Sequence, residues 1–250
     1  MNKYYLIHLL IYINIPILAQ DASFSSNDFV NITSDASLRA ETGMTIECWV
    51  NPESDTYPDY APLVHYLRLG GSTEESGFTL QYFDGELRFM ISVGDGNYDI
   101  VGDGLGLWPG TTLDQGIWTH IAGTYDVATG QAKIFKNGVE QASFATEGGN
   151  LNWDFIETMD MKIGKSEMNP GTGDTFFNGG IDEVRLWNRA LDATELQSGI
   201  CTSPLGGEGL IGYWNFNDWS DATIEDLTGN GNNGTLSNSG TGDWASDALD

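Results

Sequence analysis

The chain has 250 residues, with 36 Asp plus Glu against 10 Lys plus Arg, which gives a formal net charge of −26. A surface this acidic repels phosphate backbones, so the charge excludes nucleic acid as a partner. The length suffices for one β-sandwich with a full core but not for two. The 32 glycines, many of them in Asn-Gly and Asp-Gly pairs, indicate the tight turns of an all-β protein.

The first 19 residues have the composition of a secretory signal peptide. Lys3 supplies a positive charge, residues 4–18 form an apolar run, and residues 17–19 (Ile-Leu-Ala) are an acceptable cleavage site. The run is shorter than the roughly twenty residues that span a bilayer. We therefore expect residues 1–19 to be removed on export, which leaves a secreted or cell-surface protein with no membrane insertion after cleavage.

Alternation with period two predicts short strands along most of the mature chain. In residues 45–50 (TIECWV) one face carries apolar side chains and is predicted to enter the core, whereas Glu47 and Trp49 fall on the opposite face. The core-facing residues of this strand are Ile46, Cys48 and Val50. Before it, residues 21–32 are predicted to form one edge strand, and after it come a meander of residues 63–69, 77–83 and 86–93 and a glycine-rich loop of residues 94–110.

The second half of the chain predicts further strands and one short helix. Residues 117–125, 131–136, 139–144 and 161–164 have strand patterns, and residues 145–160 form a long polar loop around Trp153. In residues 176–196, Val184 and Leu186 share one strand face and Arg185 and Trp187 the other. Asp192 is then a plausible N-cap for a helix near residues 190–198.

Several of these segments occur in an order that resembles laminin G-like and pentraxin-like domains of the concanavalin A-like jelly-roll group. The segments are TIECWVNP, WTHIAGTYD with KIFKNGVE, IGKS, and FFNGGIDEVRLWNRALDATEL. The resemblance covers most of residues 24–236. It implies an all-β, two-sheet antiparallel jelly-roll sandwich with one short helix, of the kind found as an adhesion or carbohydrate-binding module in secreted bacterial surface proteins.

The C-terminal segments leave two alternatives. Residues 209–216 and 226–236 resemble the segment that often opens such a domain. They either supply a missing edge strand to this sandwich or begin a second, truncated unit. We favour the first, because one apolar strand left alone is unstable. The domain is then expected over residues 20–236, with residues 209–216 closing the sandwich and residues 237–250 as an acidic tail or linker.

The jelly-roll group includes glycoside hydrolases and polysaccharide lyases, so catalysis has to be tested. A retaining glycosidase needs two facing carboxylates, which laminarinase-like enzymes of this fold supply from a Glu-x-Asp-x-x-Glu strand. The sequence has no such run, and Asp182 and Glu183 are adjacent and predicted to face opposite sides of their strand. We therefore predict that the protein is not an enzyme.

Calcium is a candidate ligand, because acidic oxygen ligands are abundant and related folds often carry this ion. Asp95, Asn97 and Asp99 are spaced like the first half of an EF-hand loop. The pentraxin resemblance adds Glu167, which falls in the run that binds calcium in pentraxins. Asp182 is a further candidate ligand, and the acidic, glycine-rich loop of residues 226–232, which begins with Asp226, is a second candidate loop. For the first loop and for residues 226–232 the alternative is a turn whose Asp and Asn side chains bond their own backbone, and for Asp182 it is a carboxylate that satisfies backbone donors.

Exposed aromatic side chains are candidate platforms for sugar rings, whose C–H faces stack on Trp or Tyr. The opposite face of the predicted core strands adds Trp49, Arg185 and Trp187 as candidates; the alternative is that these tryptophans cover the core or its edges. The candidates in loops are Tyr57, Tyr60, Tyr98, Trp108 and Trp153.

Cys48 and Cys201 are the only cysteines, and export permits a disulfide between them. The sequence leaves both the paired and the unpaired state open, because it does not show whether the two residues are close.

The sequence thus predicts a non-catalytic extracellular binding or adhesion module with a glycan or extracellular protein as partner, with or without calcium. The alternatives are a structural spacer domain of a multidomain adhesin or polysaccharide-degrading enzyme, and a glycoside hydrolase or polysaccharide lyase of the same fold.

Overall fold

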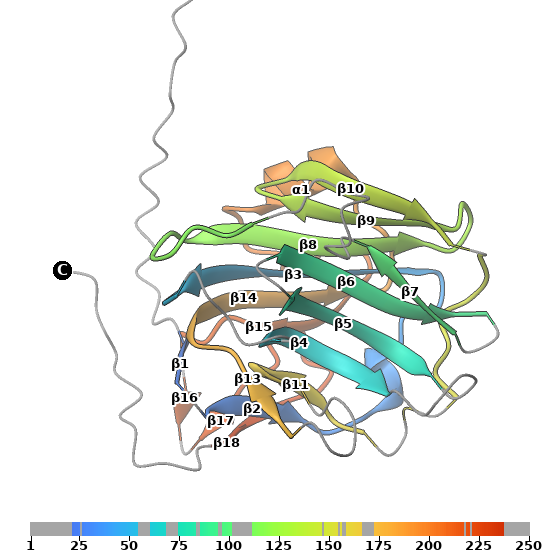
Figure 1. Cartoon of the computed structure of the whole chain (residues 1–250). Helices are drawn as coiled ribbons and strands as arrows, with labels where there is room; N and C mark the ends of the chain where they lie inside the picture. Colours follow the sequence, from blue (N-terminus) through green and yellow to red (C-terminus); the bar gives the residue numbers. More distant parts are fainter. Residues whose placement is uncertain are drawn as a thin grey trace, which may run out of the picture.

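A computed structural model shows two antiparallel sheets packed face to face (Figure 1). The predicted signal peptide and residues 238–250 lie outside the described residues. Among the residues described, no helix is long and apolar enough to cross a membrane. The structure describes residues 22–25, 27–54, 61–68, 75–83, 86–94, 97–101, 112–146, 148–154, 156, 159–166, 173–217, 219–220 and 222–237.

The first sheet has β14 and β3 near its centre. These two strands pair in register through Ile181 with Val50 and Leu186 with Ile46. The strand order is β1 (Ala22–Phe24), β14 (Gly179–Trp187), β3 (Gly43–Pro52), β8 (Thr119–Asp126), β9 (Gln131–Lys136) and β10 (Val139–Ala145), and β15 (Leu210–Trp214) also pairs with β14.

The second sheet contains the predicted meander at one end and the C-terminal strands at the other. Its order is β16 (Trp219–Ser220), β17 (Thr223–Ile224), β18 (Gly234–Ser237), β2 (Phe29–Ile32), β11 (Met161–Ile163), β4 (Ala61–Arg68), β5 (Ser76–Phe83), β6 (Glu86–Val93) and β7 (Asn97–Val101). The small strands β12 (Lys165–Ser166) and β13 (Thr175–Phe176), the 3-10 turn η1 (Ala36–Leu38) and the helix α1 (Ala193–Gly199) complete the described elements.

The core lies between the sheets, where the alternation placed it. Ile46, Cys48 and Val50 of β3 are fully buried there, as are Val184 and Leu186 of β14. Each fully buried aliphatic side chain of this kind contributes about 1.5–3 kcal/mol. The predicted two-sheet antiparallel sandwich with one short helix is confirmed.

A second, smaller apolar cluster lies beneath α1, on the side of the first sheet that faces away from the core. We call this side the outer face. Its buried members are Ala122, Phe135, Trp187, Leu191 and Leu196.

The helix begins as its sequence predicts. Asp192 accepts hydrogen bonds from the backbone N–H groups of Thr194 and Glu195, and the Glu195 carboxylate accepts one from the N–H of Asp192. This reciprocal capping box fixes the first turn of α1.

Two segment predictions are corrected by the structure. Residues 21–32 do not form one edge strand: β1 pairs with β14 in the first sheet, and β2 lies inside the second sheet between β18 and β11. Asp28 bonds the N–H and hydroxyl of Ser25 at the crossing between the sheets. The predicted glycine-rich loop contains a strand, β7, which pairs with β6.

The C-terminal strands belong to this sandwich. β15 pairs with β14 and β18 pairs with β2, so the segment after α1 contributes to both sheets. Trp214 is fully buried in the core, and its indole N–H donates to the carbonyl of Asn232 at 2.9 Å. The pairing agrees with the alternative in which the tail supplies edge strands to the same domain.

Candidate functional site

A bulge in β14 reorients its side chains at the middle of the first sheet. Between Asp182 and Arg185 the register with β3 shifts, so that two residues of β14 oppose one of β3. Glu183 has a φ of 53° there, in the left-handed region. The extra residue lets Ile181 and Val184 both enter the core although they are three positions apart.

Alternation from Val184 and Leu186 implies that Asp182 faces the core and Glu183 the opposite side. The bulge changes this for Asp182, which pairs with Trp49 of β3 while Ile181 enters the core. Glu183 lies on the outer face as alternation implies, and its carboxylate accepts hydrogen bonds from Arg185 and from the Tyr213 hydroxyl. The acidic side chain is therefore presented on the side of the sheet that carries α1.

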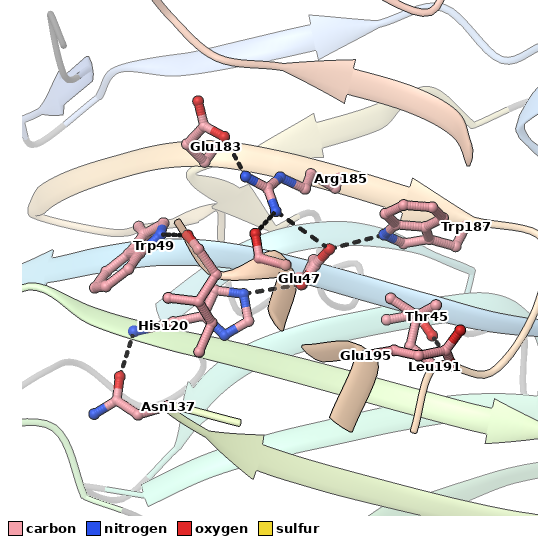
Figure 2. A network of polar contacts seen from close by, with 12 residues as sticks. Thr45, Glu47, Trp49, His120, Asn137, Glu183, Arg185, Trp187, Leu191 and Glu195 are labelled. Atoms are coloured by element: carbon pink, nitrogen blue, oxygen red, sulfur yellow. Dashed lines mark hydrogen bonds and ion pairs between the residues drawn. The ribbon is translucent and has the colours of Figure 1, made fainter. Parts of the chain in front are cut away.

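A buried charge pair lies next to this bulge, between Glu47 of β3 and Arg185 of β14 (Figure 2). The two side chains are 2% and 3% exposed, and the Arg185 Nη1 atom lies 3.8 Å from Glu47 Oε1. The same carboxylate accepts hydrogen bonds from the Trp187 indole at 2.8 Å and from His120 Nε2 at 2.9 Å. Each oxygen of the buried carboxylate thus has a donor, which such a charge requires.

These contacts set the charge state of the pair. Burial by itself would raise the pKa of Glu47, but the hydrogen bond from His120 and the charge of Arg185 hold that pKa below its ordinary value. Burial opposes the charge on Arg185, and the Glu47 and Glu183 carboxylates more than compensate, so its pKa is raised. Glu47 and Arg185 are therefore ionised together inside the protein.

Arg185 also fastens the end of α1 to the sheet. Its Nη1 donates to the carbonyl of Gly199 at 3.0 Å and its Nη2 to the carbonyl of Thr202 at 3.3 Å. The Trp49 indole donates to the carbonyl of Ile200 at 3.3 Å. Carbonyls at a helix C-terminus lack partners within the helix, so two outer-face side chains of the sheet supply donors to this segment.

The fastened segment forms one wall of a pocket of about 340 Å³ on the outer face. Trp49, partly exposed, lies on the sheet side, and Leu205, 54% exposed, lies on the segment after α1. Tyr213 and Arg185 are nearly buried at its base, with the guanidinium 5.6 Å from the centre of the tyrosine ring. The pocket is lined by Trp49, Glu183, Arg185, Ile200, Cys201, Thr202, Ser203, Leu205, Tyr213, Asn215, Asn217 and Leu227.

Most of the loop residues proposed from the sequence are not part of the structural description. For Asn97, Tyr98 and Asp99 the structure describes the backbone, which is β7, but not the side chains. The candidates that lie outside the described residues are Tyr57, Tyr60, Asp95, Trp108 and Glu167.

Trp153 packs against the edge of the core. Its indole donates to the carbonyl of Ala40 at 3.0 Å, and its ring lies 5.9 Å from that of Tyr66 and 6.4 Å from that of Phe78. Trp153 therefore covers the edge of the core, because its indole N–H and its ring are used in contacts within the protein.

The carboxylates proposed for calcium that the structure describes bond backbone groups. Asp182 is 3% exposed and accepts from the N–H of Glu183 at 2.7 Å. Asp226 accepts from the N–H groups of Tyr213, Thr228 and Asn232, as in the alternative of a self-bonded turn. Within the described part of the chain, no three His, Cys, Asp or Glu side chains are grouped to hold a metal ion.

The two cysteines are not joined. Cys48 is buried in the core and Cys201 is exposed at the pocket, and both are free. Burial, with the nearby charges of Glu47 and Asp182, raises the pKa of the Cys48 thiol, which keeps it protonated. The disulfide that the sequence left open is thus absent from the structure.

Sequence reasoning identified part of this site. Trp49 and Arg185 were candidates because both fall opposite the core, and the structure places them in one pocket. Glu183, Tyr213 and His120 were missed as site residues. Glu47 could have indicated these partners, because it is a charged residue inside an otherwise apolar strand. A buried carboxylate needs cationic or hydrogen-bond donor partners from neighbouring strands.

Replacing Arg185 with Met tests how much the buried pair stabilises the fold. We expect Arg185→Met to lower the free energy of unfolding by about 3–5 kcal/mol, because it leaves Glu47 buried without its counter-charge. The matched control is Arg189→Met, whose partner Glu195 is a surface carboxylate and whose loss should cost less than about 1 kcal/mol. Urea denaturation measures both, and equal effects would contradict the assignment.

The pH dependence of stability tests the charge state of Glu47. Because its pKa is lower in the folded state than in the unfolded state, its stabilisation is complete above the unfolded pKa and declines as the pH falls through the folded value. We expect wild type to be more stable than Glu47→Gln near pH 7, with the difference shrinking below about pH 4. A difference that stays constant down to pH 2 in urea titrations would contradict this.

Comparison with known proteins identifies solved structures of similar fold and a family for this chain. No curated protein matches the chain. A putative carbohydrate binding protein from Bacteroides ovatus is similar over 88% of this chain and 58% of its own, with 21% identity and a TM-score of 0.66. The chain therefore spans just over half the length of that protein.

Two smaller solved domains have a similar fold. The CBM40 module of the Ruminococcus gnavus IT-sialidase, bound to α2,3-sialyllactose, is similar over 72% of this chain and 95% of its own (18% identity, TM-score 0.53). Domain 4 of the GH43 extracellular arabinanase AbnA from Geobacillus stearothermophilus, in complex with arabinotriose, is similar over 71% and 75% (20% identity, TM-score 0.50). At these identities the likeness concerns the fold. Residues 24–197 match the family Laminin_G_3, described as the concanavalin A-like lectin/glucanases superfamily, and the protein belongs to this family.

Proposed function

We propose that this protein is a non-catalytic extracellular module that binds a glycan in the outer-face pocket. The observation that carries the proposal is the pairing of a partly exposed tryptophan, Trp49, with a partly exposed carboxylate, Glu183, in one pocket. Sugars present apolar C–H faces and a rim of hydroxyl groups, so their recognition needs both an aromatic surface and oriented hydrogen-bonding groups.

The size and lining of the pocket support a sugar ligand. Its volume of about 340 Å³ is near the lower end of the range for small-molecule sites, which suits about one or two sugar rings. Asn215 and Asn217 add carboxamide groups beside Glu183, and Leu205 offers a further apolar surface at the rim. Three solved proteins of similar fold are described as carbohydrate binding or as bound to an oligosaccharide. They support a glycan as the class of ligand but not a particular sugar.

The arrangement of carboxylates favours binding over hydrolysis. Glycoside hydrolysis uses two carboxyl groups that flank the scissile bond. Among the described residues that line the pocket, Glu183 is the one carboxylate. Glu47 lies deeper, almost fully buried and bonded to Trp187 and His120, so it is poorly placed to meet a substrate.

Export and calcium form part of the same proposal. The composition of residues 1–19 supports secretion or display at the cell surface. A role for calcium rests on the spacing of Asp95, Asn97 and Asp99. The binding experiment therefore includes calcium and a chelator as separate conditions.

A glycan array followed by calorimetry tests the proposal. We expect wild type to bind at least one oligosaccharide, and Trp49→Ala to weaken that binding by about 10-fold or more, because the loss of one buried aromatic face is worth a few kcal/mol. Trp49→Phe keeps an aromatic face and should retain more affinity.

The matched control is Ile117→Ala, an exposed apolar residue outside the pocket lining, which should bind as wild type does. Thermal denaturation verifies that each variant is folded. An empty array with and without calcium would contradict glycan binding and favour a structural spacer. Binding that survives Trp49→Ala unchanged would place the glycan elsewhere.

A further inference from the structure

We infer that the pocket takes a neutral, hydroxyl-rich sugar and discriminates against acidic sugars. This inference rests on the proposed function and specifies the class of ligand for the same site. It follows from which charged groups remain available to a ligand. Among the described residues that line the pocket there is one cation, Arg185, and one carboxylate, Glu183, and the protein uses them very differently.

The cation is already committed to the protein. Arg185 is 3% exposed, its Nη2 donates to Glu183 and to the carbonyl of Thr202, and its Nη1 donates to the carbonyl of Gly199. Glu47 faces Nη1 at 3.8 Å, and Nε is buried without a hydrogen-bond partner. Both terminal nitrogens of the guanidinium are therefore used by the protein and Nε is shielded from solvent, whereas recognition of a sugar carboxylate normally requires an accessible donor.

The carboxylate, in contrast, remains partly available. Glu183 is 20% exposed and accepts from the Tyr213 hydroxyl at 2.8 and 2.9 Å and from Arg185. An ionised carboxylate has about four acceptor positions and no donor, so the exposed part of Glu183 can accept hydrogen bonds from sugar hydroxyls. The carboxylate of an acidic sugar at this position would face the Glu183 carboxylate, and neither anion has a hydrogen to donate to the other.

The surroundings reinforce the negative character of the site. Glu47 and Glu183 flank a single guanidinium, and no lysine lines the pocket among the described residues. Burial and the charge of Glu183 raise the pKa of Tyr213, so its hydroxyl stays protonated as a donor to Glu183. A second carboxylate about 4 Å from Glu183 would be repelled at the effective dielectric of a protein surface, enough to lower affinity by about 10-fold or more.

The backbone at Glu183 is a separate observation that points to use of its side chain. A φ of 53° favours glycine or asparagine, and a glutamate adopts it at some cost. Strained residues of this type gather at functional sites. Glycine at this position of the bulge would relieve the strain but remove the side-chain acceptor, and asparagine would replace the charged carboxylate with a shorter, neutral amide.

Matched pairs of oligosaccharides test the inference by calorimetry on the full secreted chain. The pairs are lactose with sialyllactose, and neutral xylo-oligosaccharides with the same chains bearing glucuronic acid, alongside arabinotriose and gluco-oligosaccharides as further neutral probes. We expect the tightest ligand to be neutral and its acidic counterpart to bind at least about 10-fold more weakly when the acid enters the pocket.

Glu183→Gln separates the charge from the size of the side chain. It should weaken the neutral ligand by about 10-fold, as expected for losing a charge-assisted hydrogen bond, and it should narrow the gap between neutral and acidic partners. Thermal denaturation checks that the variant is folded, and Glu195→Gln, which removes a carboxylate outside this pocket, is the matched control.

The outcomes separate a failure of this inference from a failure of the proposed function. If no oligosaccharide of either class binds, the proposed function fails. If an acidic sugar binds more tightly than its neutral partner and Trp49→Ala abolishes that binding, glycan binding stands and the inference is overturned. Neutral binding that is unchanged in Glu183→Gln would also overturn it.

Discussion

The ion pair of Glu47 and Arg185 is the interaction on which the outer face of the first sheet depends. A charged group in a protein interior needs an opposite charge and hydrogen bonds for its remaining atoms. Here the partners come from three places: Trp187 and His120 on neighbouring strand positions, Glu183 in the bulge, and the carbonyls of Gly199 at the end of α1 and Thr202 after it. The pair therefore joins the central strands to a segment that follows them in the chain.

The same contacts shape the pocket. If Arg185 were apolar, the carbonyls of Gly199 and Thr202 would lose their bonds to the sheet, although Gly199 would still accept from the N–H of Thr202. The wall would then be held by Trp49, by the bond from Arg189 to the carbonyl of Glu208 and by apolar contacts of α1. Stability and binding geometry are thus carried by the same residues. Arg185, the one cation that lines the pocket in the described part of the chain, thus serves the fold.

Much of the fold could be predicted from the sequence, because its signals are local. Alternation in residues 45–50 identified the core face of β3, and Asp192 with Glu195 identified the start of α1. The strand β7 was missed because it is short and lies within a glycine-rich segment. The division of residues 21–32 between the two sheets was missed because a polar turn within a strand pattern resembles an irregular edge.

The site was harder to predict, because it depends on contacts between distant segments. A glutamate at position 183 does not indicate a bulge, whereas a glycine at that position would have indicated one. Alternation alone places Glu183 beside Arg185 on the outer face, but it also places Asp182 in the core, where the structure has Ile181. Trp153 looked available because it lies in a polar loop, yet its ring packs on Tyr66 and Phe78. Trp49 and Arg185 were found because the opposite face of a core strand can be read from period two alone.

Hydrogen exchange in Arg185→Met tests most directly whether the buried pair holds the pocket wall, with Lys133→Met, which breaks an exposed ion pair with Glu140, as control. The amides of Ile200, Thr202 and Gly207 are bonded within the segment after α1, so their exchange reports its local opening. The account predicts that Arg185→Met accelerates exchange in residues 199–207 by about 10-fold or more relative to β5 and β6, and that Lys133→Met does not. Unchanged relative exchange in this segment, or an equal effect of both variants, would contradict it.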